Sequence, residues 1–395
     1  MKGLSVVAEA VRASTTMAID AMYKKMRADG LDVIGFGAGE PDFNTPEHIK
    51  SAAIQAIQDN RTRYTPAAGI QELREAICER LLADCGVSYQ PGQVVVSSGA
   101  KHNLYAALQT LVNPGDEVIL PSPYWVSYFE LIKMVGGIPV VIKTTQEQGF
   151  KMSAEQLRAA VTEKTKVLIL NNPSNPTGMM YDEFALASVA DVCIAHDLYV
   201  IADEIYYSLV YDNRKFVSFV SLGEKVKERT ILINGVSKTY AMTGWRIGYA
   251  LAPDHIAKVM ANYLSHATSA PSSISQWAAV EALRGPQEDI EEMRQAFEVR
   301  RNYIYQEMNR IPSVSCICPE AAFYVMMSLD ELLGKTLHGT LIRDADDFAK
   351  VFLEIGRVAV VPCSGFGVPN YVRWSYATSL ENIQEGLSRL KDFLS

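Results

Sequence analysis

The chain has 395 residues, of which 48% are apolar and 21% are charged, and its formal net charge is −8. This composition is typical of a globular protein and excludes a fibrous or largely disordered chain. The modest acidic balance, without a basic stripe, argues against a nucleic-acid partner, and no apolar run is long enough to span a bilayer.

The first twenty residues contain Glu9 and Arg12 and lack an unbroken apolar stretch followed by a cleavage site. We therefore expect no signal peptide. Six cysteines are scattered along the chain without the C-x-x-C spacing of a zinc site, at Cys78, Cys85, Cys193, Cys316, Cys318 and Cys363. We expect reduced thiols, no metal site and a cytoplasmic protein.

From residue 45 onward, helical and strand patterns alternate. A helix is predicted to start after Thr45 as N-cap, with Pro46 at its first position. Five apolar runs then end in small or polar residues, at 94–100, 117–123, 166–178, 198–206 and 230–238. Continuous apolar runs of this kind favour strands buried on both faces, so we predict a mostly parallel sheet with helices on both faces.

The C-terminal third has a different pattern. A long amphipathic helix is predicted over 288–311, followed by strands within 323–329, 358–362 and 371–378 and a helix over 381–394. We therefore predict an α/β fold with a large domain over 45–300 and a smaller α+β domain built from 1–44 and 301–395.

Open α/β sheets bind ligands beyond the carboxyl ends of their strands, and the unusual residues lie there. "SSGAKHNLY" passes from a strand through Gly99 into a helix, which is a suitable place for a phosphate, although an ordinary strand-to-helix turn is an equal alternative. A dinucleotide fingerprint in "VIGFGAGEP" is weak, because the spacing is wrong and Pro41 follows where a helix should begin.

Two further residues end apolar runs. Asp203 could cap a turn, but its position also suits a carboxylate that stays ionised against a buried cation, with the phenol of Tyr206 nearby. Asn175 precedes Pro176, so it either belongs to a Pro-rich turn or is an amide held by a rigid, cis peptide bond.

Lys238 directly follows a predicted buried strand, and Arg246 lies eight residues later. Most lysines are solvated and inert. Burial and a neighbouring cation would instead lower the pKa of this amine and make it nucleophilic. Together with a phosphate cradle, these side chains are the groups that hold pyridoxal 5'-phosphate (PLP).

The chain resembles the fold-type I aminotransferases, and within them the bacterial subgroup beta of the aspartate aminotransferase family. The resemblance covers essentially the whole chain. It is carried by "GAGEPDFNTPEHI", "RYTPAAGIQELREAI", "SSGAKHNLY", "PSPYWVSY", "NNPSNPTG", "ADEIYY", "SKTYAMTGWRIGY" and "YVRWSYATS".

The resemblance implies a role for each matching residue. Lys238 would bind the cofactor covalently and act in catalysis with Asp203, which pairs with the pyridine nitrogen, and Tyr206. The other implied cofactor contacts are Asn175 and Tyr206 at the ring hydroxyl, Trp125 on the ring face, and Gly99, Ala100, Lys101, Ser237, Arg246 and a second subunit's Tyr64 at the phosphate. Substrate would be bound by Arg373 at its α-carboxylate, with help from Gly39, Trp125, Asn175 and Lys101.

Two departures from the family pattern bear on these roles. Gly235 stands where many relatives have a phosphate-binding serine. The segment 263–273, where the alpha subgroup has an arginine for the partner's substrate, contains no arginine. In beta-subgroup relatives a lysine at the position of Lys101 binds the distal carboxylate instead, which favours a dicarboxylic substrate; alternatively, Lys101 serves only the phosphate or the helix start.

The resemblance therefore implies a homodimeric enzyme with shared active sites that converts L-aspartate and 2-oxoglutarate to oxaloacetate and L-glutamate by a ping-pong mechanism. An aromatic amino acid or prephenate aminotransferase is the nearest alternative, because Arg12 and the tyrosine-rich surroundings could accept a bulkier acid. A PLP-dependent β-lyase and the cofactor-binding part of a transcription regulator are less favoured alternatives.

Overall fold

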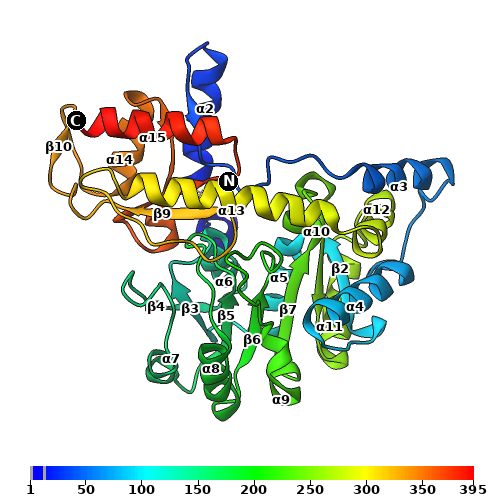
Figure 1. Cartoon of the computed structure of the whole chain (residues 1–395). Helices are drawn as coiled ribbons and strands as arrows, with labels where there is room; N and C mark the ends of the chain where they lie inside the picture. Colours follow the sequence, from blue (N-terminus) through cyan, green and yellow to red (C-terminus); the bar gives the residue numbers. More distant parts are fainter. Residues whose placement is uncertain (1–2, 12–14) are drawn as a thin grey trace.

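The computed structural model describes residues 3–11 and 15–395 and centres on a seven-stranded sheet (Figure 1). The strand order is β2-β8-β7-β6-β5-β3-β4, and β8 runs antiparallel to both of its neighbours while the other pairs are parallel. The predicted mostly parallel sheet is confirmed. Its strands are β2 Val94–Ser98, β3 Glu117–Ser122, β4 Ile138–Lys143, β5 Thr165–Asn171, β6 Tyr199–Asp203, β7 Thr230–Gly235 and β8 Ile247–Leu251.

Alternate side chains along the strands pack into two apolar clusters, one on each face of the sheet. In β7, Leu232 packs into one cluster, and Ile231 and Ile233 pack into the other. Burial on both faces is the physical reason that apolar and polar residues do not alternate in this run.

The helices are α1 Val6–Glu9, α2 Thr15–Ala28, α3 Glu47–Gln58, α4 Gln71–Cys85, α5 Ala100–Leu111, α6 Val126–Met134, α7 Ala154–Ala160, α8 Glu183–Ala195, α9 Glu224–Lys227, α10 Val236–Thr239, α11 Asp254–Ala267, α12 Ser273–Arg284, α13 Glu288–Met308, α14 Ala345–Glu354 and α15 Leu380–Leu394, with short 3₁₀ turns η1 Pro91–Gln93, η2 Phe219–Leu222, η3 Thr243–Trp245 and η4 Cys363–Phe366.

A smaller unit packs beside the large sheet. It contains the antiparallel sheet β13-β14-β9, the parallel pair β1-β12 and the hairpin β10-β11. Because β1 comes from the N-terminal part of the chain and β12 from the C-terminal part, both parts contribute to this unit. Its strands are β1 Ile34–Gly35, β9 Tyr324–Ser328, β10 Thr336–Leu337, β11 Thr340–Leu341, β12 Val358–Ala359, β13 Val361–Pro362 and β14 Tyr371–Ser375.

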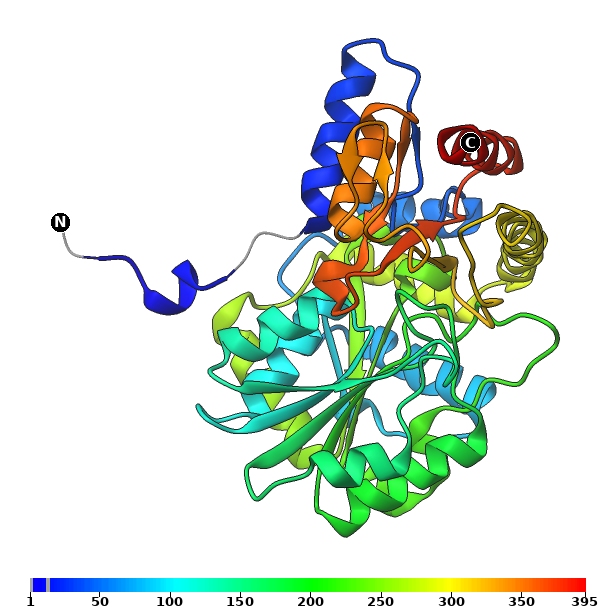
Figure 2. The same cartoon turned by 90° about the vertical axis from the view of Figure 1, so that its left-hand side faces the viewer.

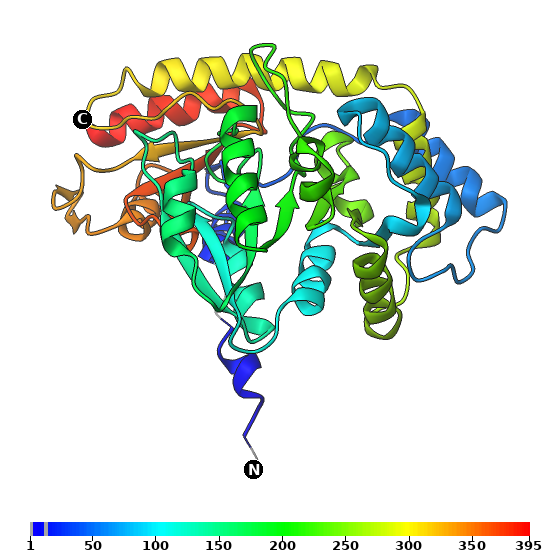
Figure 3. The same ribbon diagram turned by 90° about the horizontal axis from the view of Figure 1, so that it is seen from below.

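The long helix α13 links the two units. In Figure 1 it runs below α15, from the smaller unit to the large one, and in Figure 3 it lies along the upper edge of the molecule. It packs against α15. The helix continues without interruption through residue 300. The domain boundaries at 44/45 and 300/301 stay a prediction.

The segment around α1 extends away from the rest of the fold (Figure 2). Leu4, Val6 and Val7 on this segment are exposed. The Lys133 ammonium group connects the segment to the rest of the fold, because its Nζ donates to Ala10 O at 3.2 Å. Among the residues described, no helix is long and apolar enough to cross a membrane. All six cysteines are free thiols.

Thr45 does not cap the first predicted helix, so that prediction was wrong. The N-cap of α3 is Pro46, and the Thr45 hydroxyl instead donates to Ala241 O at 2.7 Å. The hydroxyl thus donates to a carbonyl that is distant in the sequence and does not accept from a backbone N–H of the first helical turn. This bond ties the start of α3 to the turn after α10. The strands β4 and β8 were not among the five predicted runs.

The backbone of β8 approaches the start of α5 very closely. A Cβ atom on Gly248 would lie 2.1 Å from Ala100 N, which is far below any van der Waals contact. The glycine is therefore needed for the sheet and α5 to pack at this distance.

We predict that Gly248→Ala lowers the free energy of unfolding by about 1–3 kcal/mol, because the added methyl group forces the sheet and α5 apart. Urea unfolding would measure the loss. Gly244→Ala is the matched control, since no atom lies within 4 Å of its Cβ; equal stability of the two variants would contradict the proposed role of this contact.

Candidate active site

The predicted site residues come mainly from the carboxyl ends of neighbouring parallel strands. Asp203 ends β6, Asn175 follows β5, and Lys238 lies in α10, directly after β7. Asn171 links two of these ends, because its Nδ2 donates to Asp203 O at 2.9 Å and its Oδ1 accepts from Asn175 N at 2.8 Å. The Asn175–Pro176 peptide bond is cis.

Lys238 is half-buried, and its Nζ donates to Gly39 O at 2.5 Å. Burial lowers the pKa of this amine to about 8, and the positive charges of Arg246 and Arg373 act in the same direction, whereas Glu40 opposes them. The amine therefore exchanges its proton near neutral pH, as a nucleophile and proton carrier must.

Asp203 is buried and held by two donors. The Tyr128 hydroxyl donates to its Oδ2 at 2.6 Å, and Ile205 N donates to Oδ1 at 3.3 Å. Burial raises the pKa of Asp203 to about 6, although both hydrogen bonds and the charge of Lys238 favour the anion. Sequence reasoning missed Tyr128, and its place three residues after Trp125 gave no signal that its hydroxyl would reach β6.

The start of α5 forms a cationic cradle with Arg246. The guanidinium donates to Thr243 O at 3.0 Å and Ser98 O at 3.3 Å, and a Cβ on Gly99 would lie 2.3 Å from its Nη2. Gly99 N donates to Ser97 O at 2.7 Å. The N–H groups of Ala100 and Lys101, in the first turn, have no acceptor within the helix, so they remain for an anion.

Arg373 lies on β14 of the smaller unit and is buried. Its Nη1 donates to Asn175 Oδ1 at 2.9 Å and its Nη2 to Gly37 O at 3.0 Å, while its Nε is buried without a hydrogen-bond partner. The guanidinium also lies 4.4 Å from the ring centroid of Tyr324. The two units therefore meet at this side chain.

Tyr206 lies beside Asn175 and Tyr324. Its hydroxyl is 2.9 Å from the Tyr324 hydroxyl and 3.5 Å from Asn175 Nδ2. Burial raises the pKa of Tyr206 well above its usual value, so the phenol stays protonated and can donate. Tyr324 was also missed by sequence reasoning, because only the folding of β9 onto the large unit brings it here.

Of the remaining predicted residues, Trp125 and Ser237 are at least partly buried, whereas Tyr64 is exposed. Lys101 Nζ lies 4.7 Å from the ring centroid of Trp125, and partial burial and the charge of Arg246 lower the pKa of Lys101. Ser237 is buried in α10. Tyr64 differs, because its side chain is fully exposed and makes no hydrogen bond to any other site residue described.

The charges of the site fit a ligand with two separate anionic groups. Neither Arg246 nor Arg373 has a carboxylate partner among the residues described, although most other arginines do. Arg373 is buried, so its unpaired charge and its orphaned Nε are costly unless a ligand supplies an anion. Arg246 is exposed, so its guanidinium is open to an anionic ligand. The donor set around Lys238 and Asp203 therefore fits PLP together with a carboxylate.

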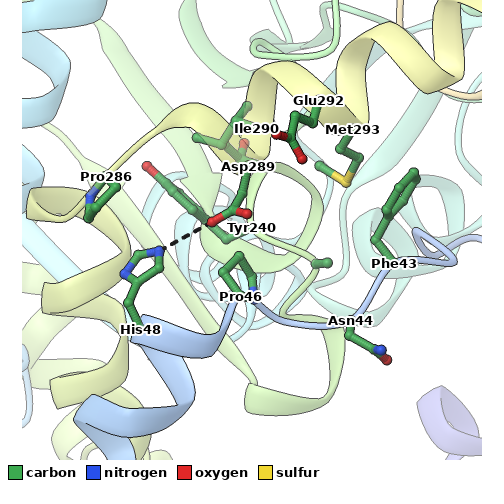
Figure 4. A pocket seen from close by; sticks show the side chains of 12 residues that line it. Phe43, Asn44, Pro46, His48, Tyr240, Pro286, Asp289, Ile290, Glu292 and Met293 are labelled. Carbon is green, nitrogen blue, oxygen red and sulfur yellow. Dashed lines mark ion pairs between the residues drawn. The ribbon is translucent and has the colours of Figure 1, made fainter.

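A separate cavity of about 100 Å³ lies between α3, the turn after α10 and the start of α13 (Figure 4). His48 faces this cavity and lies 3.6 Å from Asp289 and 2.9 Å from Glu281. Thr239, Tyr240 and Ala241 line it, but none of the predicted site residues does. We therefore do not assign the active site to this cavity.

Comparisons with known proteins agree with this geometry. Residues 31–390 match the family "Aminotransferase class I and II". The chain is 49% identical to the aspartate aminotransferase of Bacillus subtilis (strain 168) over 98% of this chain and 97% of the relative. It is 44% identical to a probable aspartate/prephenate aminotransferase of Aquifex aeolicus over 100% of this chain and 99% of the relative. The structure of Thermus thermophilus aspartate aminotransferase with maleate matches with a TM-score of 0.93 and 39% identity over 100% of both chains.

We predict that the amine of Lys238 reacts with an acylating reagent at a rate that reaches half its maximum near pH 8, whereas an ordinary lysine does so near 10.4. Competitive labelling at a series of pH values, read by mass spectrometry of the Lys238 peptide, measures this without any cofactor.

Two variants should shift the midpoint in opposite directions. Glu40→Gln removes a negative charge and should lower it, and Arg246→Met removes a positive charge and should raise it. Shifts of the same sign, or a wild-type midpoint above 10, would contradict this account of the amine.

Proposed function

The chain belongs to the class I and II aminotransferases, and from this membership and the geometry of the site we propose that it transfers the amino group of L-aspartate to 2-oxoglutarate, giving oxaloacetate and L-glutamate in a ping-pong cycle. It is an enzyme that depends on PLP. The observation that carries the proposal is the pair of arginines without carboxylate partners, Arg246 and Arg373, whose positive charges both act on the amine of Lys238.

We propose that the two arginines bind different anions. Arg246 and the free N–H groups at the start of α5 lie together and suit a phosphate, to which the Ser237 hydroxyl is assigned as a further donor. Arg373 is rigidly held by Asn175 and Gly37, so its fork is oriented for the α-carboxylate of a substrate. Fixing both ends of the reacting pair supplies the orientation that transamination needs.

PLP, when bound, withdraws electrons from the substrate carbon that loses its proton. Asp203 would support this chemistry as the anionic partner of the pyridine nitrogen, and the donors Tyr128 and Ile205 N help to keep its carboxylate ionised. Asn175 and Tyr206 are the proposed partners of the ring hydroxyl, and Trp125 would stack on the face of the ring.

Lys238 is the proposed carrier of the proton. Its pKa of about 8 lets the amine take and return a proton near neutral pH, which typically contributes about 10²- to 10⁴-fold to the rate. Gly39 O, at 2.5 Å from Nζ, is an acceptor that holds the amine in place while it is not bonded to cofactor. Gly39 thus positions the lysine next to the carboxylate site.

Lys101 is the proposed partner of the distal carboxylate of a dicarboxylic substrate. It lies over Trp125, which is the proposed ring-stacking residue, so its ammonium group is close to the reacting centre. The Thermus thermophilus structure with maleate is consistent with a dicarboxylate in this fold.

We also propose a homodimer with shared active sites. Tyr64 is fully exposed although its hydroxyl is assigned to a phosphate, and a second copy of the chain would resolve this by covering it. Sedimentation at micromolar concentration should give the mass of a dimer.

The aromatic or prephenate alternative is supported by the similarity to the Aquifex aeolicus relative. Arg12, which favoured it, lies outside the described residues. Steady-state kcat/KM values with aspartate and tyrosine as donors and with 2-oxoglutarate and prephenate as acceptors separate the two functions. A preference for tyrosine over aspartate would overturn the proposal, and pyruvate release from a cysteine derivative without an oxo acid would indicate a β-lyase.

We predict that Lys101→Gln lowers kcat/KM for aspartate about 10- to 100-fold, because one charge-assisted hydrogen bond to the distal carboxylate is lost. Alanine, which has no distal carboxylate, is the control donor and should be nearly unaffected. An equal loss with both donors would mean that Lys101 serves the cofactor rather than substrate choice.

A further inference from the structure

Gln276 is a fully buried polar side chain on α12 that the proposed chemistry does not use. Its Oε1 accepts from Ile70 N at 2.8 Å, and its Nε2 donates to Thr65 Oγ1 at 3.1 Å and to Pro271 O at 2.9 Å. The whole amide is therefore hydrogen-bonded, and its partners belong to two connections, the one between α3 and α4 and the one between α11 and α12.

The α3–α4 connection has a second anchor on the large sheet. Val96 N of the edge strand β2 donates to Ala68 O at 3.0 Å, and a Cβ on Gly69 would lie 2.6 Å from Val96 Cγ2. The connection thus lies tightly along the sheet edge on one side and is held by Gln276 on the other. Figure 1 shows α12 packed beside α3 and α4, where this happens.

Tyr64 is the residue directly before the Gln276-bound Thr65. The tyrosine itself is fully exposed and has no hydrogen bond of its own in the chain described, so nothing on its own side chain fixes its position. The backbone of residues 65–70 fixes it instead. A fixed backbone matters because an exposed side chain that must meet a ligand loses less conformational entropy when its attachment is rigid.

We propose that Gln276 is a positioning residue that acts in the neighbouring subunit's active site: by pinning residues 65–70 it presents Tyr64 to the cofactor phosphate across the dimer interface. This rests on the proposed function, in which Tyr64 of one protomer binds the phosphate of the other. Gln276 touches neither substrate nor cofactor, so its effect is on cofactor affinity and is exerted in trans.

The test begins with homodimers of Gln276→Met, which keeps the side-chain volume and removes the three hydrogen bonds. Titration of the apoenzyme with PLP, followed by the visible band of the bound cofactor, should give an affinity about tenfold weaker, similar to that of Tyr64→Phe. Gln287→Met is the matched control. Its amide holds Ala282 O, Gly285 O and Pro286 O at the other end of α12, and it should bind PLP like the wild type.

Hybrid dimers decide whether the effect is exerted in trans. When Lys238→Ala is placed on one protomer and Gln276→Met on the other, the only lysine-bearing site receives Tyr64 from a protomer with an intact Gln276, so wild-type affinity is expected. When both substitutions are on one protomer, the only lysine-bearing site receives Tyr64 from the protomer without Gln276. The tenfold loss of PLP affinity is then expected. Tyr64→Phe in the same two arrangements gives the reference.

Each other outcome has a defined meaning. The proposal is overturned if PLP affinity falls at the lysine-bearing site of the protomer that itself carries Gln276→Met. Wild-type affinity in the Gln276→Met homodimer overturns it as well. If Tyr64→Phe leaves PLP affinity unchanged, the assigned role of Tyr64 fails, which is distinguishable because Gln276 is not changed in that variant. Should Gln276→Met not fold, Thr65→Val removes one of the three hydrogen bonds and should show a smaller loss with the same trans pattern.

Discussion

The partial burial of the Lys238 amine directly after β7 is the constraint on which the rest of the site depends. The strand is buried on both faces, so the short helix that follows it delivers the lysine to the edge of the sheet without access to bulk water on all sides. Burial would leave an isolated ammonium unstable. Burial lowers the pKa of the amine to about 8, and the surrounding charges oppose one another, with Glu40 and Asp203 raising the pKa and Arg246 and Arg373 lowering it.

At the same edge of the sheet, two glycines allow the backbone of β8, the start of α5 and the Arg246 side chain to lie close together. Gly248 lets β8 approach Ala100 N, and Gly99 leaves room for the guanidinium of Arg246, so the cationic cradle exists only because two side chains are absent. Arg373 arrives from the smaller unit, and Thr45 and Asn175 tie the neighbouring segments together. The contacts that hold the two units together therefore also position the side chains of the site.

Several features could be predicted from the sequence because they depend on local pattern. Apolar runs that end in Asp203 or precede Lys238 show strand ends, and parallel strands place those ends at one edge. Arg373 needed the resemblance, since an arginine on a strand has no local signal. Tyr128, Tyr324 and Gln276 could not be predicted, because their partners lie 75, 118 and 206 residues away in the sequence. The N-cap prediction for Thr45 failed for the same reason, because its hydroxyl donates to a carbonyl 196 residues away and does not accept from a backbone N–H of the helix.

The most direct test of the central claim is a single half-reaction. L-Aspartate is added to the PLP-loaded enzyme with no oxo acid present, and the oxaloacetate released is measured. The account predicts one equivalent per subunit, with loss of the visible band of the cofactor, and recovery of that band when 2-oxoglutarate is added. Continuous release of product without an acceptor, or no oxaloacetate at all, would contradict it.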